Sequence, residues 1–406
     1  MNGRRSKTNK CDVLIVGAGP LGWACSHLLA TKNIRSILID PNIKNTEPAW
    51  LQQGLGVFWP SLNDPPTRTV VAHGTTMAQW LQQHCRQGLE QAKLFLPGTQ
   101  LQPATCLRIG VLPHEIEELN RACELNLGIK KSDHSAHIYT DTCDSLIHVS
   151  RKNLQSLTYN KKYLSSIQAR VISLAESQEG CLARLESGEE IASEMVILAN
   201  GFQISELQPW LKDMLVPMSD IETFWRTNIA CSENEKPITL RAASGHVAAA
   251  LIPEEKQKGT WTWTVRMSGP RFMLPRAGVG IDLCGKPVDE LLVLKTKDWL
   301  KTQLIPCLGD VIHNPPAQLL ELELISSRFG VDCLPCDELP ILGDLGQSGR
   351  ILASTGWLAC GWSASFQSAS ILSEIIESGR SAKLAPLLRP RRWRSGMSED
   401  GVTGMT

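Results

Sequence analysis

The segment from residue 11 to residue 40 constrains the fold more than any other part of the sequence. Residues 12–16 form a short, β-branched apolar run, as expected for a strand buried on both faces. A glycine-rich turn at residues 17–22 follows, and residues 23–31 have the pattern of a helix. Residues 35–40 predict a second buried strand that ends in an acid. This order predicts a Rossmann-type dinucleotide-binding unit.

Each residue type in the turn has a physical role in such a unit. Gly17 permits a tight turn, Gly19 lets the backbone approach a pyrophosphate, and Gly22 lets the helix pack closely on the strand. The helix N-terminus offers N–H groups and a positive dipole end to the phosphates. The acid after the second strand can bind ribose hydroxyls and disfavours a 2′-phosphate, and therefore NADP. The predicted cofactor contacts here are Gly17, Gly19, Pro20, Leu21, Gly22, Asp40 and Pro41.

Two later segments predict strands that return to the same domain. Residues 167–174, 181–185 and 190–197 have strand patterns, and the last ends in a small-residue turn with glycine. Near the C-terminus, a strand at 350–356 passes through glycines into a helix over 364–378, whose N-terminus can stabilise negative charge. The predicted cofactor contacts in these segments are Val171, Ala199, Asn200, Gly201, Gly356, Trp357, Gly361 and Trp362.

Composition excludes several classes of function. Lys plus Arg and Asp plus Glu both number 41, so no overall field favours nucleic acid or an anionic membrane. No run approaches the roughly 18 apolar residues of a membrane span. The thirteen cysteines are odd in number and irregularly spaced, and the polar first ten residues do not look like a secretory signal. These features predict a cytoplasmic protein with reduced thiols and no membrane span.

Six motifs together resemble the D-amino-acid oxidase, glycine oxidase and sarcosine oxidase family. They are GAGPLG (17–22), Asp40, LQQGLGVFWP (51–60), VILANG (196–201), LPCDELPILGD (334–344) and STGWLACGWSAS (354–365). The resemblance implies an α/β fold: a Rossmann-type FAD-binding domain built from discontinuous segments, with an inserted sheet-rich (α+β) substrate domain. It also implies that residues 54–59 lie along the flavin ring, with Gly54, Gly56 and Val57 as further cofactor contacts and Trp59 at the reaction site.

The expected domain boundaries follow from these motifs. The FAD-binding domain comprises residues 11–80, 145–205 and 330–385, and the substrate domain comprises 81–144 and 206–329. Within them, residues 76–95 and 113–125 predict amphipathic helices. Residues 1–10 and 386–406 are expected to be flexible tails, because they are rich in polar, Pro and Gly residues.

The resemblance implies a flavoenzyme that oxidises a C–N bond of a small-molecule amine or amino acid. A hydride would pass to the flavin, water would hydrolyse the resulting imine, and oxygen or another acceptor would take the electrons. In glycine-oxidase-like members an Arg before the proline of the late motif holds the substrate carboxylate, but Asp332 occupies that position here. Arg328 lies four residues earlier on a predicted strand over 321–332, on the same face. Arg328 is therefore a candidate carboxylate clamp or an ion-pair partner of Asp332, and Asp332 alternatively binds a cationic amine.

Other interpretations stay open at this stage. Gly343-Asp344 superficially fits an NAD(P)H-dependent flavin hydroxylase, and the loss of the family Arg leaves a non-catalytic flavin-binding subunit possible. Cys333 and Cys336 are out of register with the covalent flavin site of sarcosine oxidases, so we expect noncovalent FAD. The two cysteines have CxxC spacing, but no second such pair is present, so we expect no metal site. The two cysteines are then either a redox dithiol or two isolated thiols. Trp261 and Trp263 share a strand face that lines a substrate cavity or packs within the sheet. The oligomeric state is not indicated.

Overall fold

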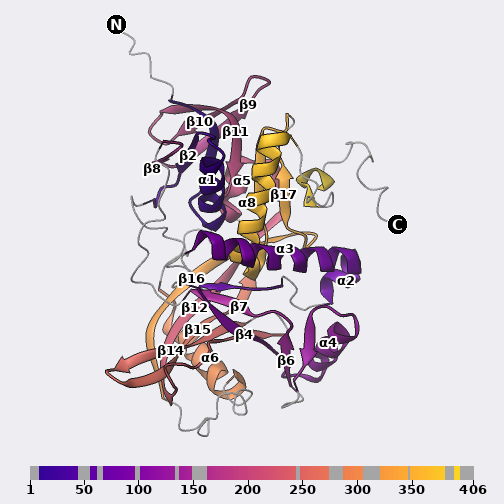
Figure 1. The fold of residues 1–406 in the computed structure, drawn as a ribbon, viewed down its shortest axis with the longest axis vertical. Helices are drawn as coiled ribbons and strands as arrows, with labels where there is room; N and C mark the ends of the chain where they lie inside the picture. The colour runs from indigo at the N-terminus through magenta and orange to yellow at the C-terminus, as the bar shows by residue number, and fades with distance from the viewer. Residues whose placement is uncertain are drawn as a thin grey trace. The chain divides into compact units, whose positions relative to one another are not determined.

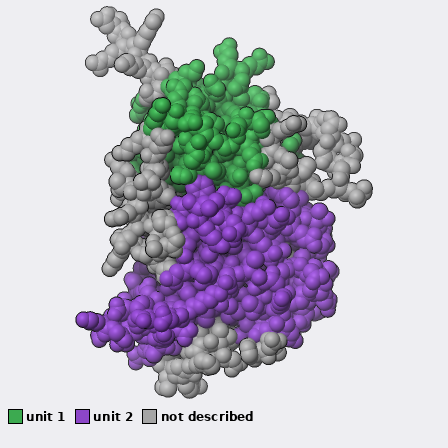
Figure 2. Space-filling view, in the orientation of Figure 1, with its two compact units in different colours: residues 1–52, 152–216, 333–406 green, residues 53–151, 217–332 purple. Residues whose placement is uncertain are grey.

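A computed structural model describes residues 9–43, 55–61, 67–96, 101–132, 137–148, 162–243, 247–273, 287–304, 321–345, 348–379 and 388–393. The chain forms two compact units, and each is assembled from separate stretches of sequence (Figures 1 and 2). Unit 1 comprises residues 1–52, 152–216 and 333–406, and unit 2 comprises residues 53–151 and 217–332.

Unit 1 is built on a mixed sheet that has eight strands among the described residues. Their order is β17-β18-β11-β1-β2-β8, and the β9–β10 hairpin joins at β11. Strands β1, β2, β8, β11 and β18 run parallel, as in a dinucleotide-binding sheet. The bounds are β1 Asn9–Val16, β2 Ser36–Ile39, β8 Leu164–Ile167, β9 Val171–Glu176, β10 Cys181–Leu185, β11 Glu190–Leu198, β17 Ile341–Asp344 and β18 Ile351–Thr355.

Two helices of unit 1 lie side by side, α1 (Pro20–Thr31) and α8 (Gly361–Ser378) (Figure 1). Each follows a parallel strand, β1 and β18 respectively, so both helix N-termini lie beyond the carboxyl ends of strands. Leu14, Val196 and Ile351 belong to the buried apolar core of this unit. The short helix α5 (Ile204–Leu207) and the 3₁₀ turns η2 (Gly201–Gln203), η3 (Pro209–Leu211), η7 (Leu358–Cys360) and η9 (Pro390–Trp393) complete the described part.

Unit 2 is dominated by a second mixed sheet, with ten strands among the described residues. Their order is β16-β12-β15-β14-β13-β4-β6-β5, and β7 joins β3 to β4. The bounds are β3 Val57–Phe58, β4 Leu101–Ile109, β5 Ile129–Lys131, β6 Ile138–Asp141, β7 Ser145–His148, β12 Leu215–Ala230, β13 Ile238–Ala242, β14 Ala248–Gln257, β15 Thr260–Met273 and β16 Leu322–Pro335. The helices are α2 Arg68–His73, α3 Thr75–Phe95, α4 Pro113–Glu124 and α6 Glu290–Trp299, which continues into η5 Leu300–Leu304.

The two faces of the unit 2 sheet differ in chemistry. One face is apolar: Leu240, Ala249 and Met267 pack in a core with Val293 of α6. Because side chains alternate along a strand, the neighbouring residues Arg241 and Arg266 point to the other face. Trp263 belongs to the apolar core and is 2% exposed, so its indole packs within the sheet rather than lining a cavity.

The main elements predicted from the sequence are present. The strands at 12–16, 35–40, 181–185 and 190–197, and the helices at 76–95 and 113–125, are confirmed to within a few residues. The helix after the glycine turn begins at Pro20 rather than at residue 23, because Gly19 is its N-cap. The compact units place residues 53–80 and 145–151 in unit 2, whereas the sequence assigned them to the FAD-binding domain. No helix among the described residues is long and apolar enough to cross a bilayer.

Candidate functional site

The glycine turn between β1 and α1 is folded tightly against the end of β11. Gly17 has φ +105°, and a Cβ on it would lie 2.6 Å from the backbone carbonyl of Ala199. A Cβ on Gly22 would lie 1.9 Å from the oxygen of Gly17. Both positions therefore require glycine because of the protein's own backbone.

Gly19 differs from these two glycines. A Cβ on Gly19 would meet no atom closer than the oxygen of Ala199, at 3.8 Å. Gly19 is the N-cap of α1, and Pro20 occupies the first helical position. The first N–H groups of a helix have no acceptor within the helix, so this end is suited to an anion. The open space at Gly19 lies where the sequence predicts a pyrophosphate.

Asp40, at the end of β2, holds the turn from the other side. One carboxylate oxygen accepts a hydrogen bond from the N–H of Ala18 at 2.9 Å, and the other accepts from the N–H of Asn42 at 2.7 Å. A carboxylate has about four acceptor positions, so two of them remain for further donors. Pro41 is exposed, and its carbonyl accepts a hydrogen bond from the side chain of Gln168 at 3.1 Å.

Asn200 follows β11 and adjoins Gly17. Its backbone nitrogen would lie 2.7 Å from a Cβ on Gly17. Its side-chain oxygen Oδ1 is buried, and no hydrogen-bond partner for it lies within the described part of the chain. A buried acceptor without a donor costs about 1–3 kcal/mol, so it indicates a ligand with a hydroxyl or N–H group. Val171, by contrast, is 6% exposed and belongs to the apolar core of unit 1.

The late motif forms a second glycine turn, between β18 and α8. Gly356 has φ +77°, and a Cβ there would meet Cγ of Pro335 at 2.5 Å. Trp357 is 4% exposed, and its indole N–H donates to Oγ of Ser354 at 2.7 Å. Gly361 begins α8, has nothing within 4 Å of a Cβ position, and is followed by the half-buried Trp362. The start of α8 therefore offers free space at Gly361, whose N–H already donates to the carbonyl of Leu358 in the preceding turn η7.

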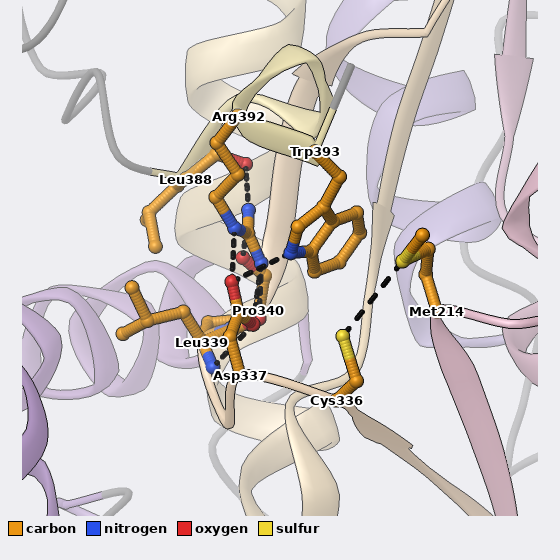
Figure 3. Close-up of polar contacts among 8 residues, drawn as sticks. All are labelled: Met214, Cys336, Asp337, Leu339, Pro340, Leu388, Arg392 and Trp393. Carbon is orange, nitrogen blue, oxygen red and sulfur yellow. Dashed lines mark hydrogen bonds and ion pairs between the residues drawn. The ribbon is translucent and has the colours of Figure 1, made fainter. Parts of the chain in front are cut away.

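A C-terminal segment secures the turn that leads into β17. The guanidinium of Arg392 donates to both carboxylate oxygens of Asp337, at 2.6 and 3.1 Å, and to the carbonyl of Leu339 at 2.6 Å (Figure 3). The indole of Trp393 also donates to Asp337, at 2.8 Å. The sequence predicts a flexible tail over 386–406, and within that range Arg392 and Trp393 make these contacts because the guanidinium matches the carboxylate of Asp337.

Residues 55–61 belong to unit 2, and buried arginines hold them there. Gly56 has φ +71°, and a Cβ on it would meet Nη1 of Arg266 at 3.1 Å. That same nitrogen donates to the carbonyl of His148 at 2.8 Å. Val57 pairs with Ile147, so this segment continues the unit 2 sheet. Gly54 lies outside the described residues.

Trp59 is 2% exposed, and a buried arginine covers its ring. The guanidinium of Arg241 lies 4.7 Å from the ring centroid, and its Nη1 donates to the carbonyl of Ser61 at 2.6 Å. The neighbouring Arg108 forms a buried ion pair with Asp141 at 3.0 Å and donates to Oγ of Ser61. Within unit 2, Trp59 therefore packs among polar residues as well as apolar ones.

Arg328 is paired with a residue that the sequence did not suggest. Its Nε lies 2.5 Å from a carboxylate oxygen of Glu222, and its guanidinium lies 5.5 Å from the ring centroid of Phe224. Both residues come from β12, whereas Arg328 and Asp332 lie on β16. Glu222 lies opposite Ser268 of the adjacent β15 and carries no pattern in the sequence that points to Arg328.

The thiols of the CxxC sequence do not resemble a reactive pair. Neither Cys333 nor Cys336 forms a disulfide, and Cys333 is buried. Burial, with the nearby charge of Asp337, raises the pKa of the Cys336 thiol. A raised pKa lowers the thiolate fraction at neutral pH, which favours the isolated-thiol interpretation. Among the described residues, no group of three or more His, Cys, Asp or Glu side chains is placed to hold a metal ion.

No protein-family model and no curated protein matches the sequence. Solved structures do match it over nearly the whole chain. Glycine oxidase from Geobacillus kaustophilus is 15% identical, with a TM-score of 0.65 and coverage of 94% of this chain and 98% of that one. L-Proline dehydrogenase from P. horikoshii is 12% identical, with a TM-score of 0.68 and coverage of 95% and 98%. Amadoriase I from Aspergillus fumigatus, a fructosyl amine:oxygen oxidoreductase, is 12% identical, with a TM-score of 0.64 and coverage of 94% and 89%.

This chain has the fold of the amine and amino-acid oxidoreductases. The α/β fold class and the resemblance inferred from the motifs are thereby confirmed at the level of architecture. At these identities the likeness concerns the fold, and the chemistry of the site has to be argued from this chain's own residues.

Sequence reasoning missed the arginines that organise the site region. Arg108, Arg241 and Arg266 are 1%, 1% and 4% exposed, yet each occurs singly in a strand pattern. Arg392 lies within a basic run that predicts a solvated tail. The one available clue was the alternation of Arg108 and Arg241 with apolar neighbours, which places an arginine on one face of each strand.

Proposed function

We propose that this protein is an FAD-dependent oxidoreductase that oxidises a C–N bond of an amine or amino acid, with oxygen as the electron acceptor. The observation that carries the proposal is the open backbone cradle at Gly19. The cradle lies between an uncapped helix N-terminus and the buried, unpartnered oxygen of Asn200. The family fold around this cradle supports an oxidase rather than another dinucleotide enzyme.

The residues of unit 1 fit a noncovalently held FAD. The N–H groups that begin α1, at Leu21 and Gly22, suit the pyrophosphate. Asp40 retains acceptor positions for ribose hydroxyls, and Oδ1 of Asn200 accepts one more donor. The start of α8 at Gly361 suits the electron-rich edge of the flavin ring. Neither Cys333, which is buried, nor Cys336, whose pKa is raised, favours a covalent bond to the flavin.

When bound, FAD supplies a two-electron acceptor for the hydride that leaves the substrate carbon next to nitrogen. The protein itself holds the cofactor and orients the substrate. The turn at Gly17 is confined by the backbone of Ala199 and Asn200, and the turn at Gly356 by the ring of Pro335, so the cradle is preorganised rather than assembled on binding. Gly56 and Val57 remain proposed cofactor contacts on the ground of the family resemblance alone.

The ion pair between Arg328 and Glu222 argues against Arg328 as the group that binds the substrate. A carboxylate clamp at Arg328 would have to compete with Glu222 at 2.5 Å, so we propose that Arg328 is structural. Asp332, which is half-buried on the same strand face, is the better candidate to bind a cationic amine. This assignment favours an amine whose binding does not depend on a carboxylate held by Arg328.

Product analysis tests the proposal. Incubation with an amine substrate in air is expected to release a carbonyl product, the freed amine or ammonia, and hydrogen peroxide in equal amounts. Consumption of NAD(P)H with oxygen inserted into the substrate would contradict the proposal in favour of a hydroxylase. A bound flavin that no member of a broad amine and amino-acid panel reduces would support a non-catalytic flavin-binding subunit instead.

A further inference from the structure

A cavity of about 630 Å³ lies within unit 2, and none of its lining residues is assigned to the cofactor or the substrate. One wall is the second half of α3, and the other is the start of β4 together with the turn between β6 and β7. Its floor is apolar and is formed by the buried residues Leu89, Leu96, Leu101 and Leu146. The volume falls within the range that is typical of small-molecule sites.

Among the described residues, one cation at the cavity has no counter-charge. Glu90 is paired with Lys93 at 2.7 Å, and Asp144 is paired with Lys236 at 2.7 Å. Arg86 also lines the cavity, but no carboxylate within the described residues lies within ion-pair distance of it. Both carboxylates of the wall are therefore paired, whereas Arg86 has no carboxylate partner in the part of the chain that the structure describes.

The guanidinium of Arg86 is held in place but not saturated. Nη2 donates to Oγ1 of Thr142 at 2.9 Å and occupies the space left by Gly128, where a Cβ would lie 2.5 Å from it. Nη2 carries two hydrogens, so a second one remains. Nε is buried, and it donates no hydrogen bond within the described part of the chain. Nε has no surface open to the cavity, so the second hydrogen of Nη2 is the donor that remains for a ligand carboxylate.

We propose that this cavity is a second binding site, for a monocarboxylate with an aliphatic or aromatic body. The carboxylate would pair with Arg86, and the apolar body would lie on the leucine floor. The inference does not depend on the flavin chemistry, because none of the residues involved belongs to the proposed cofactor site.

Octanoate serves as the probe, with the uncharged octanamide as its matched control. Calorimetric titration of the flavin-loaded protein is expected to show octanoate binding, at least tenfold tighter than octanamide. Arg86→Gln is expected to weaken octanoate about 10- to 100-fold, because a charge-assisted hydrogen bond contributes by about that factor. Lys93→Gln, whose charge is already paired with Glu90, is expected to change it less than threefold.

Two further readouts locate the bound probe. Cys143 lines the cavity and is half-buried, so octanoate is expected to slow its alkylation by iodoacetamide, as followed by peptide mass spectrometry. The alkylation rate of the exposed Cys336, in unit 1, is expected to stay unchanged. Equal binding of octanoate and octanamide, binding unaffected by Arg86→Gln, or a shift of the flavin absorbance without protection of Cys143 would each overturn the proposal.

Discussion

The two units differ in what determines their residues. In unit 1, Gly17 and Gly22 are fixed by backbone atoms 2.6 and 1.9 Å from a would-be Cβ, and Gly356 by the ring of Pro335 at 2.5 Å, whereas a Cβ on Gly19 would meet nothing closer than 3.8 Å. In unit 2, the residues of interest are charged side chains that are paired with one another, such as Arg108 with Asp141 and Arg328 with Glu222. The features of interest in unit 1 are therefore positions that require glycine, whereas those in unit 2 are pairs of charged side chains.

This difference explains why a cofactor class is easier to infer than a substrate. A cofactor cradle is made of backbone, and backbone geometry follows from local glycine patterns. A substrate site is made of side-chain pairs between distant strands, and no local pattern specifies which pairs form. The predictions that follow test this contrast from the largest expected effect to the smallest.

Gly22→Val is expected to prevent folding of unit 1. Its Cβ would overlap the oxygen of Gly17 at 1.9 Å, so either the turn or the packing of α1 must give way. We expect a loss of more than about 4 kcal/mol in unfolding free energy, or no soluble folded protein. Urea unfolding followed by circular dichroism measures it, and native-like stability would contradict the backbone account of the turn.

Gly19→Val is expected to leave the fold intact but to remove the flavin. Because a Cβ there meets nothing closer than 3.8 Å, thermal stability without cofactor should match that of the wild type within about 1 kcal/mol. FAD affinity should fall at least 100-fold, since the side chain fills the space proposed for the pyrophosphate. Purification of this variant with full flavin content would refute the assignment of the cradle.

Arg392→Ala is expected to destabilise unit 1 by about 2 kcal/mol. It removes the two-pronged ion pair with Asp337 and hydrogen bonds to the carbonyls of Leu339 and Pro340, in a partly buried setting. Arg389→Ala, at an exposed position of the same segment, is the matched control. It should change the unfolding free energy by less than about 0.5 kcal/mol, as is typical of surface sites. Equal effects of the two variants in urea unfolding would show that Arg392 does not stabilise unit 1 and would support a solvated tail.

Arg328→Ala separates the structural role from a substrate clamp. We expect a loss of about 1–2 kcal/mol in unfolding free energy, because the buried Glu222 loses a charged partner. The KM for a carboxylated substrate should rise less than about fivefold. A rise of about 100-fold, with stability unchanged, would show instead that Arg328 holds the substrate carboxylate.

The smallest effect is expected at the exposed pair of Asp12 and Arg35, which joins the starts of β1 and β2. The hydrogen bond from Arg35 lowers the pKa of the Asp12 carboxyl in the folded state. A lowered pKa means that the pair stabilises the fold above the unfolded pKa of about 4 and loses this contribution as the pH falls further. Arg35→Ala should therefore destabilise the protein at pH 6 by less than Arg392→Ala does, with no difference from the wild type near pH 2. An equal effect at both pH values would contradict this linkage.

The sequence predicted unit 1 in more detail than unit 2, for physical reasons. The strand, glycine turn, helix and acid of residues 12–40 are local, so their order alone predicts β1, α1 and β2; the hydrogen bond from Ala18 to Asp40 appears only in the structure. The partners of Arg328 and Arg392 lie 106 and 55 residues away, and a single sequence carries no signal for such distant pairs. The domain to which residues 53–80 belong was also not predictable, because it depends on pairing between β3 and β7.

The most direct test of the central claim is an absorbance spectrum of the purified protein followed by anaerobic titration with amines, amino acids and NAD(P)H. Flavin bands that bleach with an amine or amino acid, and recover when oxygen is admitted, are the predicted result. A protein that shows no flavin bands and takes up no FAD would contradict the account at its root. Bleaching by NAD(P)H alone would leave the cradle in place but contradict the proposed oxidation of a C–N bond.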